Sequence, residues 1–171
     1  MKKFIYTITA AIMLVFSACG GGGEKTTFTL KDVPFSMTGP LYEGPNLFQS
    51  TVKIDLKAIL GAKYKEGVKI NNAVLTSATI KSTDSSNFDD FGSFVMSLAS
   101  DNADLRMKEL AFLNPVKPGT KMANLSVSKE VTFEDYFGEK QFYLIIDGSL
   151  IKDLETDLNF KCDFEFELTH N

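Results

Sequence analysis

Tryptophan is absent from this chain, and three residues that build reactive sites are scarce. Its 171 residues include two cysteines, one histidine and a single arginine, Arg106. The histidine, His170, is next to the end of the sequence, so a zinc site of cysteine and histidine ligands is not expected. A Ser-His-Asp or Cys-His pair is not expected either, because a fraying chain end would not hold the imidazole in a pocket.

Positive charge is in the minority, with 18 Lys and Arg against 22 Asp and Glu. Phosphate contacts need clustered Lys and Arg, so we expect no nucleic-acid partner. The same balance argues against electrostatic docking on anionic lipid. Tryptophan is the largest flat aromatic platform for a sugar ring, and its absence makes carbohydrate binding less favoured without excluding it.

Long apolar runs are also few, and the clearest one lies near the start. Residues 8–16 are mostly apolar, with two lysines before them and the small residues Ser17 and Ala18 after them. This three-part pattern is typical of a secretory signal. A membrane-spanning helix needs about 20 predominantly apolar residues, so this run is too short to span a bilayer. We predict that residues 1–18 are a signal peptide that is removed.

The segment Phe16-Ser17-Ala18-Cys19 resembles the lipobox of bacterial lipoproteins, in which the cysteine becomes the lipid-bearing first residue of the mature chain. The resemblance implies a covalent lipid on Cys19. Four glycines follow it, and because glycine-rich segments behave as flexible coil, residues 19–26 are predicted to be a tether. Gly20 stands where an aspartate is linked to inner-membrane retention in enterobacterial lipoproteins, which favours the outer membrane. The overall plan is similar to the small cell-envelope lipoproteins of Bacteroidota.

Alternation of apolar and polar residues is the main structural signal in the rest of the chain. From Leu158 to Leu168 every second residue is apolar, which predicts a strand with one buried face. Cys162 falls on that apolar face and is predicted to be a core residue rather than a reactive thiol. If Cys19 carries lipid, Cys162 has no partner for an internal disulfide. Further strands are predicted at residues 27–37, 48–56, 68–82, 92–99, 105–113, 121–128 and 141–149, the last of them central in its sheet.

Helical signal is sparse, with one short helix predicted over residues 56–64, ended by Gly67, and a short turn over 132–137. Turn signals separate the strands: Thr38-Gly39-Pro40, residues 84–87, residues 115–119 and Asp147-Gly148. We therefore predict an all-β fold over residues 27–171, as one domain. The expected architecture is a two-sheet antiparallel β-sandwich, Ig-like or jelly-roll-like, with about eight strands and one or two short helices.

Acidic residues form a ladder on the outer face of the last predicted strand, at Asp163, Glu165 and Glu167. Neighbours on one strand face stand about 6.6 Å apart, near the lower limit of the roughly 6.5–9.5 Å that separates the acid and base of inverting glycosidases. Such enzymes hold their carboxyl groups in a cleft that drives the two pKa values apart, which a flat strand face does not do. We expect a solvated face whose charges discourage edge-to-edge aggregation.

Two loops carry oxygen ligands of the kind that calcium binds, although neither has EF-hand spacing. Asp and Asn are also ordinary turn residues, so calcium is the weaker interpretation. Two loop tyrosines, Tyr42 and Tyr64, could be contact residues but are expected to pack at the margin of the core. The calcium candidates are Asp84, Asn87, Asp89 and Asp90 in one loop, and Asp101, Asn102 and Asp104 in the other.

These observations predict a lipid-anchored cell-envelope protein with a non-enzymatic binding or structural domain and no cofactor other than the covalent lipid. The lipid alone would attach it to the membrane, and its further partner would be a protein or a glycan. One alternative is a carbohydrate-binding accessory or a glycan-directed hydrolase, with the acidic ladder or the loop aspartates as working groups. Another is a fimbrial or adhesive component that accepts a donor strand.

Overall fold

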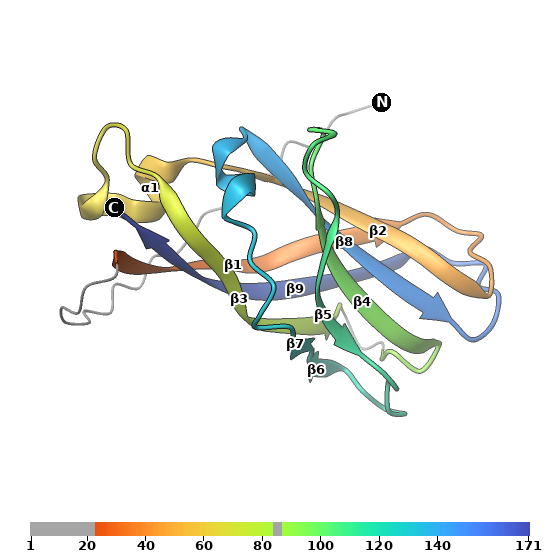
Figure 1. Cartoon of the computed structure of the whole chain (residues 1–171). Coiled ribbons are helices and arrows are strands. Elements are labelled where there is room, and N and C mark those ends of the chain that lie inside the picture. The colour runs from red at the N-terminus through yellow and green to blue at the C-terminus, as the bar shows by residue number, and fades with distance from the viewer. Residues whose placement is uncertain (1–22, 84–86) are drawn as a thin grey trace.

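The computed structural model describes residues 23–83 and 87–171, which form nine strands in two antiparallel sheets. Figure 1 shows the sheets packed as two layers. The four-stranded sheet has the order β1 (Glu24–Met37), β9 (Leu158–His170), β3 (Ile70–Ser82) and β6 (Met122–Asn124). The five-stranded sheet has the order β2 (Gly44–Lys53), β8 (Gln141–Leu150), β4 (Phe91–Ala99), β5 (Lys108–Leu113) and β7 (Ser126–Val127). The predicted all-β sandwich is confirmed.

The strand pairing distinguishes the two predicted sandwich types. β1 pairs with β9, β2 with β8, β3 with β6 and β4 with β5, all antiparallel, like the two halves of one long hairpin. Rolling that hairpin up adds the pairs β9–β3 and β8–β4. A double-sheet sandwich made from one rolled ribbon is a jelly roll, so the jelly-roll alternative is correct and the Ig-like one is wrong.

Inward-facing side chains of both sheets fill the core, and Phe160 of β9 lies among the aromatic rings. Its ring centroid is 5.4 Å from that of Phe35 on β1, 4.8 Å from Phe48 on β2 and 5.9 Å from Phe94 on β4. Cys162, the next inward residue on β9, is 1% exposed, and burial raises the pKa of its thiol well above the ordinary value. Its prediction as a core residue is confirmed.

Two sequence-based boundaries are wrong because alternation alone does not say where a strand pairs. The segment 121–128 divides at the buried Leu125, so that β6 and β7 lie in different sheets. The predicted turn at Asp147-Gly148 lies inside β8. A Cβ atom at Gly148 would meet Cε1 of Phe91 at 2.6 Å, so this glycine makes room for an aromatic ring inside a strand.

The helical segments are short. α1 (Leu56–Leu60) begins at Asp55, whose carboxylate accepts a hydrogen bond from the backbone N–H of Ala58, and the 3-10 helix η1 (Gly61–Lys63) follows directly. Gly61 ends α1 with φ of 55°, six residues earlier than the predicted end at Gly67. The 3-10 helix η2 (Glu134–Gly138) covers most of the predicted turn at 132–137. In the described part of the chain, no helix is both long and apolar enough to cross a membrane.

Both ends of the described chain lie in the four-stranded sheet. Glu24 opens β1 opposite His170, the last residue of β9, three residues before the predicted strand start. Gly23 approaches so closely that a Cβ atom there would lie 2.4 Å from the carbonyl oxygen of His170. The predicted fraying of His170 is wrong, because its side chain is fully buried and its Nε2 lies 3.0 Å from Oγ1 of Thr26. Cys19 lies outside the described residues.

Candidate functional site

The acidic ladder lies on the outer face of β9, between β1 and β3. Because β9 has a hydrogen-bonded neighbour on both sides, the ladder is not at a sheet edge. The predicted role of its charges in discouraging edge-to-edge aggregation is therefore wrong. What the three carboxylates do instead follows from the side chains that the neighbouring strands bring to them.

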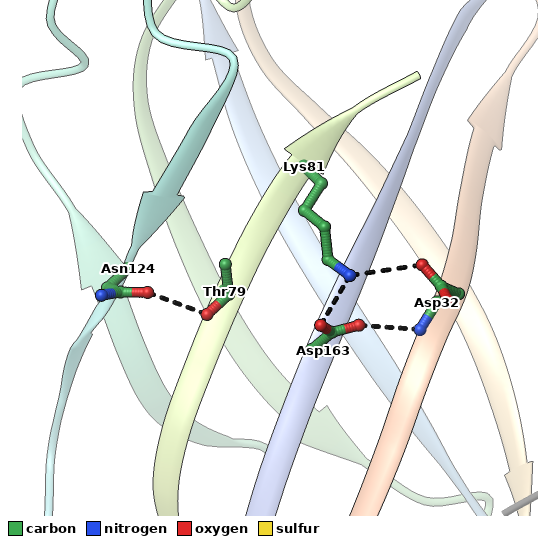
Figure 2. A network of polar contacts seen from close by, with 5 residues as sticks. All are labelled: Asp32, Thr79, Lys81, Asn124 and Asp163. Atoms are coloured by element: carbon green, nitrogen blue, oxygen red, sulfur yellow. Dashed lines mark hydrogen bonds and ion pairs between the residues drawn. The ribbon is translucent and has the colours of Figure 1, made fainter. Parts of the chain in front are cut away.

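Asp163 joins three strands, as Figure 2 shows. Its Oδ2 lies 2.6 Å from Nζ of Lys81 on β3, and its Oδ1 accepts a hydrogen bond of 2.8 Å from the backbone N–H of Asp32 on β1. Lys81 also reaches Oδ1 of Asp32 at 3.2 Å. We call Asp32, Lys81 and Asp163 the outer-face triad. It crosslinks β1, β9 and β3 on the solvent side of the sheet.

A bulge in β1 explains why Asp32 can take part. The register against β9 shifts between Leu30 and Val33, and Asp32 has φ of 52°, a left-handed conformation that Asp adopts more readily than most residues. The bulge turns the backbone N–H of Asp32 toward Asp163, where it donates the hydrogen bond. The triad therefore holds an irregularity of the backbone in place.

The triad stabilises the charged forms of its two central groups. For Lys81, partial burial lowers the pKa, but hydrogen bonds to Asp163 and Asp32 and their negative charges outweigh burial and raise the pKa above its ordinary value. For Asp163, burial raises the pKa, but the Asp32 N–H, the hydrogen bond to Lys81 and the positive charges of Lys81 and Lys31 outweigh burial and lower it. Both groups are ionised at neutral pH and neither is poised to transfer a proton there.

The other two ladder residues also have partners. Oε1 of Glu165 accepts a hydrogen bond of 3.0 Å from the Thr76 hydroxyl, and Oε1 of Glu167 lies 2.7 Å from Nζ of Lys25. Each carboxylate thus faces a different neighbour, and the three do not share an environment that separates an acid from a base. The positions that pair with the ladder on β1 and β3 are mostly Thr and Ser, with one apolar residue, Val74, opposite Glu167.

The described calcium candidates have partners of their own. Asn87 and Asp89 form an Asx turn, in which the backbone N–H of Asp89 donates to Oδ1 of Asn87 at 3.1 Å, and Asp89 also accepts from the N–H of Gly119. Asp90 pairs with Lys152 at 2.7 Å. Among the residues that the structure describes, no three His, Cys, Asp or Glu side chains are grouped to hold a metal ion. Asp84 lies outside the described residues, so the calcium site stays a prediction.

The second candidate calcium loop instead contributes to a polar cluster that the sequence analysis missed. The Tyr143 hydroxyl on β8 donates to Oδ2 of Asp101 at 2.6 Å and accepts from Nε2 of Gln141 at 2.9 Å. The hydrogen bond to Asp101 raises the pKa of Tyr143. In the same loop, Asn102 donates to Oε1 of Glu139 at 2.8 Å and its Oδ1 accepts from the N–H of Asp104 at 3.0 Å. The one sequence feature that could have indicated Tyr143 is its position in the alternating pattern of β8, which directs its side chain outward.

The outer face of the five-stranded sheet is more apolar than that of its partner. Leu47, Asp147, Val95 and Phe112 stand in one cross-strand row, and Leu47 and Phe112 are 61% and 43% exposed. Oδ1 of Asp147 is buried in this row, and no hydrogen-bond partner for it lies among the described residues. Tyr42 and Tyr64 are 68% and 38% exposed, so their predicted packing at the core margin is wrong.

A surface hollow of about 400 Å³ lies at the end of the sandwich where β9 begins. Its described lining combines aromatic rings with carboxyl, amide and hydroxyl groups. These side chains come from the end of β3, the start of β4 and the segment that leads into β9. The lining residues are Ser82, Thr83, Asn87, Phe88, Asp90, Phe91, Thr156, Asp157, Leu158, Asn159 and Phe160.

Comparisons with known proteins place the chain in no family. No protein-family model matches it, and no curated protein is significantly similar. Similar solved structures include infectious bursal disease virus Gt strain, with a TM-score of 0.47 and 13% identity over 95% of this chain and 36% of that chain. The VP2 subviral particle of the same virus gives 0.47 and 12% over 95% and 38%.

Desmodium yellow mottle tymovirus gives a TM-score of 0.29 and 12% identity over 93% of this chain and 94% of that chain. The present chain spans little more than a third of the two bursal disease virus chains. At these scores the similarities carry no argument, and the fold rests on the strand pairing.

Proposed function

We propose that this chain is a lipid-anchored protein of the cell envelope, carried on the outer membrane, whose jelly-roll domain binds a partner or has a structural role without catalysing a reaction. The observation that carries the non-enzymatic part is the state of the acidic ladder. Asp163 is held in the outer-face triad, Glu165 accepts from Thr76 and Glu167 pairs with Lys25. Three carboxylates that each bind a different partner do not make the acid–base pair of a glycosidase.

The anchor part of the proposal rests on the lipobox-like segment that ends at Cys19. Gly23 packs against the carbonyl of His170 and β1 begins at the next residue, so little chain separates Cys19 from the folded domain. Three residues, Gly20 to Gly22, lie between Cys19 and Gly23 in the sequence. A short tether of this kind would keep the domain close to the membrane that carries the lipid.

Mass spectrometry of the N-terminal peptide from the membrane fraction tests the anchor. We expect a peptide that begins at Cys19 and carries the mass of a lipid, and a Cys19→Ala variant that is lost from the membrane fraction. Cys162→Ala is the matched control, because Cys162 is 1% exposed in the core and that variant should stay membrane-bound. An unmodified N-terminus at another residue would contradict the proposal.

The double variant Glu165→Gln, Glu167→Gln tests the enzymatic alternative when it and the wild type are incubated with the same panel of glycans. The two amides keep the shape of the carboxylates and remove their charge. If hydrolysis is measured and disappears in this variant, the ladder is catalytic and the non-enzymatic proposal is wrong. We expect no hydrolysis above background for either protein.

The surface hollow favours a second candidate function, glycan or small-molecule binding. A volume of about 400 Å³ lies within the usual range for ligand pockets, and the polar side chains of Asp157 and Asn159 in its lining can hydrogen-bond a sugar, although Phe88 and Phe91 are only 2% and 5% exposed and offer little stacking surface. A glycan array tests it. Loss of an array signal on Asn159→Ala, with the exposed Gln49→Ala on β2 unchanged, would support this candidate, and an array without signal would dismiss it.

A further inference from the structure

We propose that one end of the domain, formed by residues 56–69, docks on the surface of a bilayer that contains anionic phospholipid. This inference rests on the proposed lipid anchor at Cys19. It adds a second, electrostatic contact with the membrane, made by a lysine-rich segment of a chain that is acidic overall. Three observations carry it: the length of chain available to the anchor, the position of this segment and its local charge.

The anchor can lie only a short way from the folded domain. Gly23 packs against the carbonyl of His170, and a Cβ atom at Gly23 would be 2.4 Å from that oxygen. Four Cα-to-Cα steps separate Gly23 from Cys19, so the two Cα atoms lie at most about 15 Å apart in any conformation. Lipid on Cys19 would therefore bring the end of the sandwich that contains Gly23 to the membrane surface.

Residues 56–69 lie at this same end, where β1 begins and β9 finishes, and Figure 1 shows α1 and the C-terminal end of the chain there. Nζ of Lys63 lies 3.2 Å from Oε1 of Glu24, the first residue of β1. The backbone N–H of Lys69 donates to Oδ1 of Asn171 at 2.8 Å. These contacts connect the middle and the C-terminal end of the segment to the strand ends beside Gly23.

The segment has a local excess of lysine, although the whole chain is acidic and Asp55 directly precedes the segment. Between residues 56 and 69 there are four lysines and one acidic residue, Glu66. Lys57, Lys65 and Lys69 are exposed, and within the described residues their side chains have no ion-pair or hydrogen-bond partner, whereas Lys63 is paired with Glu24. Ammonium groups without a partner in the protein are available to lipid phosphates.

The segment also offers side chains suited to the headgroup region. Tyr64 is 38% exposed and lies between Lys63 and Lys65 in the sequence. Tyrosine rings are enriched at membrane interfaces, where the ring meets apolar chains and the hydroxyl meets water, and long lysine side chains extend their charge toward phosphates. The net charge of the whole chain does not show that lysines are concentrated in one segment, so composition alone does not predict this surface.

Amine footprinting of the native lipidated protein, reconstituted in vesicles, tests the proposal. We expect labelling of Lys57, Lys65 and Lys69 to fall at least about threefold in phosphatidylcholine vesicles that contain phosphatidylglycerol, compared with pure phosphatidylcholine vesicles. Lys117 and Lys121, which lie in the loop before β6 at the opposite end, are the control and should label equally in both. High salt should restore labelling of the first three lysines.

Charge reversal separates docking from anchoring. In the wild type, nitration of Tyr64 should be lower on vesicles that contain phosphatidylglycerol than on pure phosphatidylcholine vesicles. The variant Lys57→Glu, Lys65→Glu, Lys69→Glu should remain bound to both kinds of vesicle, but its Tyr64 should be nitrated equally on both. The matched reversal of Lys117 and Lys121 should keep that difference. Equal lysine labelling in both vesicles by a protein that is bound to them would overturn the docking proposal. A native protein that carries no lipid and binds neither vesicle would overturn the proposed anchor instead.

Discussion

The Lys81 ammonium on β3 and the Asp163 carboxylate on β9 lie 2.6 Å apart, with 28% and 31% of their side chains exposed. This pair is less solvated than the Lys25–Glu167 pair on the same face, whose side chains are 61% and 37% exposed. Water screens the second pair more strongly, so the two pairs should contribute differently to stability although their distances are similar.

Replacing Lys81 with Met should therefore destabilise the domain by about 1 kcal/mol, at the upper end of the range for exposed ion pairs. The substitution also leaves the carboxylates of Asp163 and Asp32 close together without a cation. Urea unfolding measures the change, and Lys25→Met is the matched control, for which we expect less than about 0.5 kcal/mol. Equal losses in the two variants would show that burial of the triad contributes nothing.

The contribution of the triad should depend on pH at both extremes. The pKa of Asp163 is lowered from its ordinary 3.8, so its stabilisation is present above that pH and is lost as the pH falls through the lowered pKa. The pKa of Lys81 is raised from 10.5, so its stabilisation is present below that pH and is lost as the pH rises through the raised pKa. The difference in unfolding free energy between wild type and Lys81→Met should be constant between these values and shrink outside them. A difference that changes near neutral pH would contradict this assignment.

Tyr136 is fully buried, and its hydroxyl donates to the carbonyl of Arg106 at 2.7 Å and lies 3.2 Å from the carbonyl of Leu98. Tyr136→Phe leaves these carbonyls without the donor and should cost about 1–2 kcal/mol in thermal or urea unfolding. Tyr143→Phe is the control, because its hydroxyl bonds to Asp101 in an exposed setting and its removal should cost less. A smaller loss for Tyr136→Phe than for this control would show that water replaces the lost donor.

Gly148→Ala should destabilise the domain by about 1–3 kcal/mol through overpacking. Its Cβ atom would lie 2.6 Å from the ring of Phe91, which is itself 5% exposed and 4.5 Å from the ring of Phe94. Gly138→Ala provides the comparison, since a Cβ atom there meets nothing within 4 Å. The melting temperatures of the two variants, measured side by side, should show a loss only for Gly148→Ala.

Sequence patterns predicted those features that depend on one strand at a time. The alternation in β9 marks a buried face whatever its partners are, and it correctly placed Cys162 in the core. The division between β6 and β7 depends on which sheet each residue joins, and a period of two is the same in either sheet. Gly148 looked like a turn residue because its reason for being glycine, the Phe91 ring, comes from another strand.

The same limit applies to the candidate site. The ladder positions and their outward direction follow from alternation, but Lys81 and Asp32 are brought to Asp163 by strand pairing across long stretches of chain. Nothing in the sequence predicts the bulge that directs the Asp32 N–H toward Asp163. Asp32 adopts a left-handed backbone conformation there, which only the structure shows. For His170, proximity to the end of the sequence suggested mobility, whereas pairing of β9 with both β1 and β3 fixes it.

The central position of β9 has a consequence for the order of folding. The four-stranded sheet has β9 between β1 and β3, and contacts such as that of Thr26 with His170 join residues 144 positions apart. β1 and β3 are synthesised first but do not pair with each other, so this layer cannot close until residues 158–170 have emerged. Folds dominated by such distant contacts form slowly. The four-stranded layer of a chain with this topology therefore stays open until its last strand has been made.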